Sequence, residues 1–108
     1  MRRRQGLAAA AALAARAVAE APGPCALCGR PLGAQTEWHH VVPKSEGGRE
    51  TEPVHPICHR TIHATLANAE LARLGTLDAL RGEPAIARFL RWIADKPADF
   101  HAPTRRSR

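Results

Sequence analysis

The hydrophobic pattern near the start of the chain differs from the pattern that follows it. Residues 7–20 are almost all Ala, Leu and Val, interrupted by Arg16 and Glu20. These residue types favour a helix but give it little with which to pack against a core. Residues 1–22 are therefore predicted to be a basic, Ala-rich helix or a disordered segment that lies outside the functional unit.

A change to β-branched and aromatic residues predicts a β-hairpin further along the chain. Thr36–Pro43 has the sequence Thr-Glu-Trp-His-His-Val-Val-Pro, which is typical of a short strand ended by proline. The sequence Ser-Glu-Gly-Gly at residues 45–48 favours a loop, and Pro53-Val54 favours a return strand. The two strands are short, so they need a helix or a metal ion to stabilise them.

A helical period follows this hairpin. No helix-breaking residue occurs from Cys58 to Leu74, and apolar side chains recur at Ile62, Leu66 and Ala69. We expect one helix over this range, ended by Gly75, because glycine commonly follows the last helical residue.

Two shorter helices are predicted after Gly75. Thr76 can cap a helix over residues 77–81, and Pro84 can begin a third helix that ends before Pro97. One face of the third helix carries apolar side chains, so we expect it to cover a small core. These side chains are Ile86, Phe89, Leu90 and Ile93.

The length of the chain limits it to one domain. With 108 residues, of which the hairpin and first helix are only a part, the chain cannot bury a large core. We place the domain at residues 23–100, with a core at 25–75 and a helical cover at 76–96. Residues 101–108 form a basic tail that is expected to be disordered.

The net charge of +6 suggests an anionic partner, but most of that charge lies at the chain ends. Removing six terminal arginines from the sixteen basic residues leaves ten, which balance the ten acidic residues. Such termini can hold phosphates through salt-sensitive contacts, yet solvated ends are often basic without binding anything. The net charge alone therefore does not indicate nucleic-acid binding, which has to be inferred from the residues of a specific site. The six arginines are Arg2, Arg3, Arg4, Arg105, Arg106 and Arg108.

The cysteines favour a reducing, cytoplasmic location. Three cysteines are an odd number, and two of them stand three positions apart, which suits a metal better than a disulfide. The segment that begins at Arg2 resembles the opening of a signal peptide, but Arg16 interrupts its apolar run. No stretch is long and apolar enough to span a membrane, so no membrane partner is expected.

Eight side chains that can bind metal fall between residues 25 and 63, and their spacing divides them into two groups. A Cys-x2-Cys pair and a His-x2-Cys pair supply four ligands for a structural zinc, which small domains use in place of a large core. The remaining four histidines suffice for three ligands to a second ion and one free imidazole. The zinc ligands are Cys25, Cys28, His55 and Cys58, and the other group is His39, His40, His59 and His63.

Two alternatives remain open for the first group. His59 or His63 could replace His55 as the fourth zinc ligand, or the cysteines could be ordinary thiols. For the second group, His39 or His40 could be a packed or exposed histidine without a metal. Adjacent strand residues point to opposite faces, so His39 and His40 can address one phosphate only if the strand is bent or bulged.

The segments at residues 38–48 and 55–63 together resemble the HNH endonuclease motif in its zinc-bearing form. The first contains His-His, a proline and a Gly-Gly loop, and the second contains His-x2-Cys-His at the start of a helix. His55 stands where the family usually has a cysteine, and Glu50 stands where it usually has asparagine. The resemblance covers residues 25–75. It implies an α+β fold, a small zinc-stapled ββα-metal unit with added C-terminal helices.

The resemblance also implies a role for each histidine of the second group. The chain also resembles the colicin nucleases, in which a His-His pair is joined by a His-x3-His helix. By that match, His39, His59 and His63 of this chain would hold the catalytic metal and His40 would be the general base. An imidazole suits that task because its ordinary pKa of about 6.5 leaves it partly neutral at physiological pH. Glu50 could brace the loop, bind the ion or do neither.

The three imidazole ligands favour a transition metal at the second site. Zn²⁺, Ni²⁺, Co²⁺ or Mn²⁺ suits nitrogen ligands better than Mg²⁺, which prefers oxygen. Lys44, Arg49 and Arg60 are close in sequence to the site and could contact the phosphates of DNA. Nothing in the chain resembles a base-reading element, so weak sequence preference and nicking of one strand are expected.

The sequence therefore predicts a metal-dependent DNA endonuclease whose products, by the family resemblance, carry 5′-phosphate and 3′-hydroxyl ends. One alternative is a non-catalytic zinc module that binds nucleic acid or protein. Another is a nuclease that acts only within a larger phage or restriction assembly, because a chain this short has no separate recognition domain.

Overall fold

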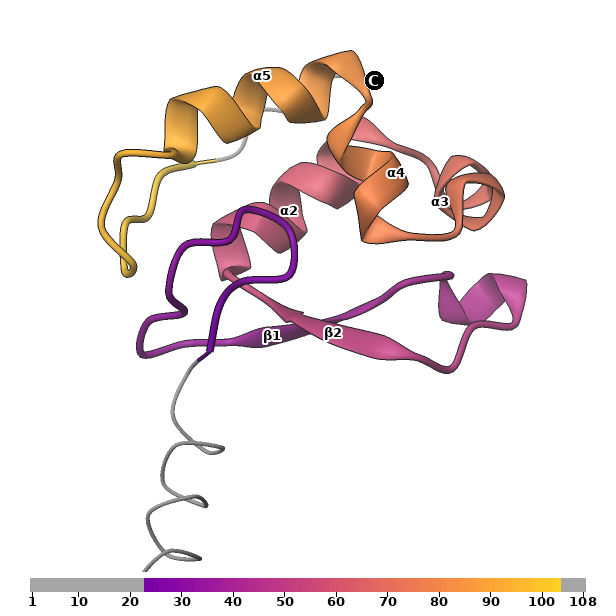
Figure 1. Ribbon diagram of the computed structural model, residues 1–108. Helices are drawn as coiled ribbons and strands as arrows, with labels where there is room; N and C mark the ends of the chain where they lie inside the picture. Colours follow the sequence, from indigo (N-terminus) through magenta and orange to yellow (C-terminus); the bar gives the residue numbers. More distant parts are fainter. Residues whose placement is uncertain (1–22, 104–108) are drawn as a thin grey trace, which may run out of the picture.

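The computed structural model of the protein describes residues 23–103, and Figure 1 shows their arrangement. The Ala-rich segment predicted at residues 1–22 and the last part of the basic tail, residues 104–108, lie outside the described residues. The elements are β1 (Glu37–His40), the 3-10 helix η1 (Lys44–Glu46), β2 (Thr51–Val54), α2 (Pro56–Thr65), α3 (Asn68–Leu74), α4 (Leu77–Arg81) and α5 (Pro84–Ile93).

The predicted hairpin is present as an antiparallel pair of strands. Glu37 pairs with Val54 and His40 pairs with Thr51, and the same register continues one step further, where the Val41 amide donates to the Glu50 carbonyl. The pairing is regular from residue 37 to residue 41, so the strand has no bulge at the paired histidines. Side chains in β1 therefore alternate between the face toward α2 and the outer face.

Two adjacent glycines shape the loop between the strands. Gly47 ends η1 with a φ of 90°, a left-handed conformation that side chains rarely adopt. At Gly48 a Cβ atom would overlap the backbone carbonyl of Val42, so the loop can close only because this residue has no side chain. The predicted Gly-Gly loop is confirmed, and both glycines have a geometric reason.

The prediction of a single helix from Cys58 to Leu74 is wrong, because the chain forms two helices, α2 and α3, over this range. Leu66 adopts an extended backbone after α2 and is 5% exposed, so the break turns an apolar side chain into the core. The Glu70 carboxylate then accepts the Ala67 amide at 2.9 Å and satisfies a donor at the start of α3. No glycine or proline marks this break; burial of Leu66 and a local cap favour it.

The remaining helix boundaries agree with the sequence. Gly75 ends α3 with a φ of 77°, and the Thr76 hydroxyl accepts the Ala79 amide at 3.1 Å at the start of α4. Pro84 occupies the first turn of α5, whose Ile86 and Ile93 are fully buried. The predicted covering role of this helix is confirmed.

The fold has layers, with the hairpin on one side and the helices on the other. Figure 1 shows α2 lying over the hairpin and α5 lying beyond α2, and α5 also contacts α4. The core between them contains Val54 from β2, Ile57 and Ile62 from α2, and Leu80 from α4. This is an α+β fold, as predicted. Among residues 23–103, no helix has the length and apolar character needed to cross a membrane.

Replacing Gly48 with alanine should destabilise the hairpin, because the added methyl group would displace the Val42 carbonyl. We expect the free energy of unfolding to fall by more than about 1 kcal/mol. Gly23→Ala is the matched control, since the space around that position is open and its φ is not left-handed. Denaturant unfolding followed by circular dichroism measures both, and equal stability of the two variants would contradict the account of the loop.

Candidate metal centres

The first metal centre begins with a tight turn at Cys25–Cys28. The Cys25 amide donates to the Arg30 carbonyl at 2.9 Å, and the Gly29 amide donates to the Cys25 carbonyl at 2.9 Å. Gly29 has a φ of 80°, which lets the chain reverse after the second cysteine. The Cys28 amide also points at the Cys25 sulfur, 3.5 Å away. The turn therefore presents both sulfurs toward one point.

The second half of this centre comes from the start of α2. His55 precedes the helix and Cys58 lies in its first turn, so the two side chains project from one helix end. The ligand atoms of Cys25, Cys28, His55 and Cys58 all lie within 4.8 Å of one another. We refer to these four residues as the zinc clasp. These four side chains, which could hold a structural zinc, are the ones that the sequence analysis selected, with His55 as the fourth.

The tautomer of His55 suits a metal ligand. Its Nε2 lies 2.8 Å from the Pro31 carbonyl, which can only accept, so Nε2 carries the hydrogen and Nδ1 keeps a lone pair. That Nδ1 lies 3.4 Å from the Cys28 sulfur and 3.8 Å from the Cys58 sulfur. In a tetrahedral zinc site, nitrogen and sulfur ligands are about 3.5 Å apart. The clasp therefore has the donor set and dimensions that zinc requires.

The thiols of the clasp compete for negative charge. Hydrogen bonds from Cys28 and Cys58 lower the pKa of Cys25 far below its usual range, while the same contacts with Cys25 raise the pKa of Cys28 and of Cys58. Protein groups alone thus favour one thiolate among three sulfurs. A divalent cation would let all three ionise, which is the chemical reason for placing zinc here.

Arg30 links the zinc clasp to the C-terminal part of the domain. Its guanidinium donates to the carbonyls of Lys96 and Pro97, at 2.9 and 2.7 Å, and another of its nitrogens lies 3.5 Å from His55 Nδ1. Arg30 is 9% exposed. Three thiolates and one Zn²⁺ carry a net charge of −1, so this buried cation would neutralise the centre. Sequence analysis did not single out Arg30, because an arginine in a turn carries no such signal.

The second metal centre lies between β1 and α2. His39 projects from β1, while His59 and His63 are one turn apart on α2. Their ligand nitrogens lie within 4.8 Å of one another, and their ring centroids are separated by 4.9 to 5.3 Å. Three imidazoles bound tetrahedrally to one ion have centroids about 5 Å apart. We refer to these three residues as the histidine cluster.

His39 gives the strongest reason to place a metal in the histidine cluster. It is fully buried, and neither of its ring nitrogens has a hydrogen-bond partner in the described structure. A buried polar atom without a partner destabilises a fold by about 1–3 kcal/mol. Burial, followed by the neighbouring His59, His63 and His40, lowers the pKa of His39 to about 4. His39 is therefore neutral at pH 7, and neutral imidazole is the form that binds metal.

Glu37 is a member of this centre that sequence analysis missed. Its Oε1 accepts a hydrogen bond from His59 Nδ1 at 2.9 Å, which leaves His59 Nε2 with its lone pair for a metal. A carboxylate in this position fixes the tautomer and orientation of a metal-binding histidine. Glu37 and His39 share a strand face because they are two residues apart, so strand alternation could have identified it.

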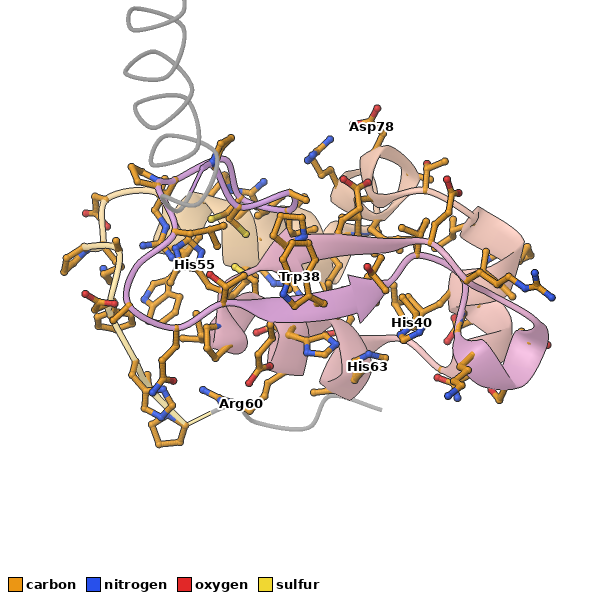
Figure 2. All side chains as sticks on the ribbon, turned by 90° about the horizontal axis from the view of Figure 1, so that it is seen from below. Trp38, His40, His55, Arg60, His63 and Asp78 are labelled. Atoms are coloured by element: carbon orange, nitrogen blue, oxygen red, sulfur yellow. The ribbon has the colours of Figure 1, made fainter. Side chains whose placement is uncertain are left out.

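His40 lies beside the histidine cluster without belonging to it. It is the last residue of β1 and is half-buried, and strand alternation directs it away from the face of His39. Figure 2 shows the His40 ring at the end of β1, beyond the ribbon on the side where His63 lies. His40 is close enough to His39 for its charge to contribute to the lowered pKa of His39, although His40 is not one of the three residues whose ligand nitrogens converge.

The other residues selected from the sequence lie outside both centres. Glu50 is exposed, belongs to neither group of ligands, and its carboxylate accepts no hydrogen bond from the described residues, so nothing in this structure shows it bracing the loop. Lys44 and Arg49 are exposed on the hairpin loop. Arg60 follows His59 on α2 and contacts the His101 ring nitrogen at 3.0 Å. These positions leave Lys44 and Arg49 open to a polyanion.

Comparisons with known proteins agree with this geometry. The family model described as HNH endonuclease matches residues 25–65, which contain the zinc clasp, the hairpin and α2. The chain is also 43% identical over 88 residues to "Uncharacterized protein YisB" of Bacillus subtilis (strain 168). That match covers 79% of this chain and 87% of the relative. No solved structure matches the chain significantly.

The chain therefore belongs to the HNH endonuclease family. Its members are generally nucleases that act on DNA, and the domain at residues 25–65 suggests a nuclease-type function. The resemblance predicted from the two motif segments is confirmed.

Two independent metal centres predict different effects for two ligand substitutions. Cys58→Ala should remove zinc and unfold the domain, because structural zinc contributes about 10–16 kcal/mol of apparent binding free energy. His63→Ala should keep the clasp metal and the fold but lose the second ion. Elemental analysis of dialysed protein and circular dichroism measure both effects. One metal ion per chain in the unaltered protein would contradict the account.

Arg30→Met should weaken zinc retention by about 10- to 100-fold, because the substitution removes the charge that balances three thiolates. Competition with a chromogenic chelator measures the affinity. Arg73→Met is the matched control, since Arg73 is exposed on α3 and loses the same charge away from the clasp. If both variants retained zinc equally, Arg30 would have no role in the centre.

Proposed function

We propose that this protein is a metal-dependent endonuclease that hydrolyses DNA phosphodiester bonds, nicking one strand with weak sequence preference. The observation that carries the proposal is the convergence of three imidazoles around a common point, where the nitrogens of the fully buried His39 have no hydrogen-bond partner among residues 23–103. A histidine that only packed in the core would have its ring nitrogens hydrogen-bonded. The half-buried His40 directly follows His39 in β1, and this adjacency supports a role for it beside the ion.

His39, His59 and His63 would hold the catalytic ion. A divalent transition metal bound there would stabilise the negative charge that builds on the phosphoryl and leaving oxygens. Three protein ligands leave coordination positions open, whereas the zinc clasp uses four. Imidazole ligands favour Zn²⁺, Ni²⁺, Co²⁺ or Mn²⁺ over Mg²⁺.

His40 is proposed as the general base. Its imidazole accepts a proton from a water molecule, whose oxygen attacks phosphorus in line with the 3′ oxygen. The bond from phosphorus to the 3′ oxygen breaks, and that oxygen takes up a proton. The products carry a 5′-phosphate and a 3′-hydroxyl. Glu37 acts as a positioning residue through its hydrogen bond to His59.

Cations on the hairpin loop and on α2 support the assignment of DNA as substrate. Lys44 and Arg49 are exposed on the hairpin loop, and Arg60 lies on α2 directly after His59. Such residues hold phosphates and orient a strand but do not read its sequence. We assign Glu50 no chemical step, because it lies outside both groups of metal ligands.

Replacing His40 with alanine should abolish plasmid nicking while leaving the fold and both metal ions in place. General-base catalysis contributes about 10²- to 10⁴-fold to a rate, so a loss of at least 100-fold is expected. The measurement uses supercoiled plasmid and metal-stripped protein to which Mg²⁺, Mn²⁺, Ni²⁺, Co²⁺ or Zn²⁺ is returned. Zinc in the clasp is restored first, so that folding is constant.

His101→Ala is the control, since it removes an exposed histidine outside both metal centres. Full activity of His40→Ala would exclude the proposed base. Absence of metal-dependent nicking by the unaltered protein would instead favour a binding module, or a nuclease that needs a larger phage or restriction assembly. Addition of host extract to the metal-loaded protein separates those two.

A further inference from the structure

Trp38 is exposed in a way that the fold does not require. Its side chain is 60% exposed, and within residues 23–103 no aromatic ring or cation packs against it. The other tryptophan, Trp92, is also partly exposed at 47%, but it contacts Phe89, Phe100 and Lys96. Trp92 thus has a packing role, and Trp38 does not. Single exposed aromatic side chains are common on protein surfaces, so exposure by itself does not indicate a function for Trp38. Its position on the hairpin does.

Trp38 shares the outer face of the hairpin with His40. The two residues are two positions apart in a strand with regular register, so their side chains leave the same face about 6.7 Å apart. Figure 2 shows the Trp38 ring lying across the two strands toward the viewer, with His40 at the end of β1. Directly opposite Trp38 is Pro53, a rigid and uncharged ring. The indole therefore stands one nucleotide's length from the proposed base.

The backbone at Trp38 is fixed by its neighbours. Glu37 is bonded to His59 on α2, and His39 is fully buried in the histidine cluster. Because both flanking side chains are anchored on the inner face, the backbone from which the indole projects is held in place relative to the cluster. A rigid aromatic surface loses little entropy when a planar group stacks on it.

The chemistry of the surroundings favours a nucleobase as that planar group. Exposed Lys44 and Arg49 lie on the loop of the same hairpin as Trp38, so a phosphate chain bound to them would run close to the strand that carries the indole. Stacking of a base on an aromatic side chain contributes about 1–3 kcal/mol and works for any base. Bases inside a duplex are already stacked on both sides, so only an unpaired base can offer a face.

We propose that Trp38 is a stacking platform for one unpaired base beside the scissile phosphate, which directs cleavage to single-stranded or locally opened DNA. The inference rests on the proposed nuclease function, since it places the base relative to His40. It names a substrate class for this nuclease, namely strands with an unpaired base, without requiring that any particular base be read.

Binding is tested with full-length, metal-loaded protein that carries His40→Ala, so that cleavage does not interfere. Trp38→Ala in this background should lower the affinity for a labelled single-stranded 20-mer by about 5- to 150-fold, which corresponds to 1–3 kcal/mol. Affinity for the matched duplex should change less than about twofold. Trp38→Phe should retain most of the single-strand affinity because phenylalanine keeps an aromatic face.

Tryptophan fluorescence distinguishes stacking from a general loss of structure. The chain has two tryptophans, so Trp92→Phe leaves Trp38 as the only reporter and Trp38→Phe leaves Trp92. Single-stranded DNA should quench the fluorescence of the first variant and leave that of the second unchanged. Circular dichroism of each variant shows whether it is folded.

The preference for unpaired DNA is measured as a cleavage rate with protein that retains His40. The substrates are a duplex that carries one bulged nucleotide and the same duplex without the bulge. Faster cleavage next to the bulge, abolished by Trp38→Ala, supports the inference. Equal effects of Trp38→Ala on duplex and single strand, or no quenching of Trp38, overturn it. Plasmid nicking that depends on His40 but not on Trp38 leaves the nuclease function intact and rejects the platform alone.

Discussion

The structure depends on the crowding of three sulfurs and one imidazole nitrogen at the junction between an N-terminal turn and the start of α2. Without a cation, Cys25, Cys28 and Cys58 compete for one negative charge; with zinc, all three can ionise and hold the turn against the helix. The same junction fixes His55, which precedes α2, and thereby sets where α2 lies against the hairpin. The histidine cluster forms only because that placement brings α2 to His39.

The two metal centres share α2 but have opposite chemical designs. The clasp has four ligands in a mostly buried setting, with Arg30 to balance its charge, and this arrangement excludes substrate. The histidine cluster offers three ligands, of which His63 is the most open to solvent, and the half-buried His40 follows His39 in the strand. An ion in the first centre would stabilise the fold, and an ion in the second would keep coordination positions open for chemistry.

Much of this arrangement could be predicted from the sequence, because metal ligands and turn residues carry strong local signals. The Cys-x2-Cys spacing, the Gly47-Gly48 loop and the four-residue spacing of His59 and His63 each favour one local geometry. The break at Leu66 could not be predicted, because it comes from burial against distant residues rather than from a helix breaker. Arg30 and Glu37 were missed for a related reason: their roles depend on partners far away in the chain.

The central claim is that this chain holds two metal ions in two separate and chemically different sites. Anomalous diffraction from crystals of the metal-loaded protein tests it most directly. The account predicts one peak surrounded by three sulfurs and the Nδ1 of His55, and a second peak among the rings of His39, His59 and His63. A single peak at the sulfurs, with hydrogen-bonded partners on the His39 nitrogens, would contradict it.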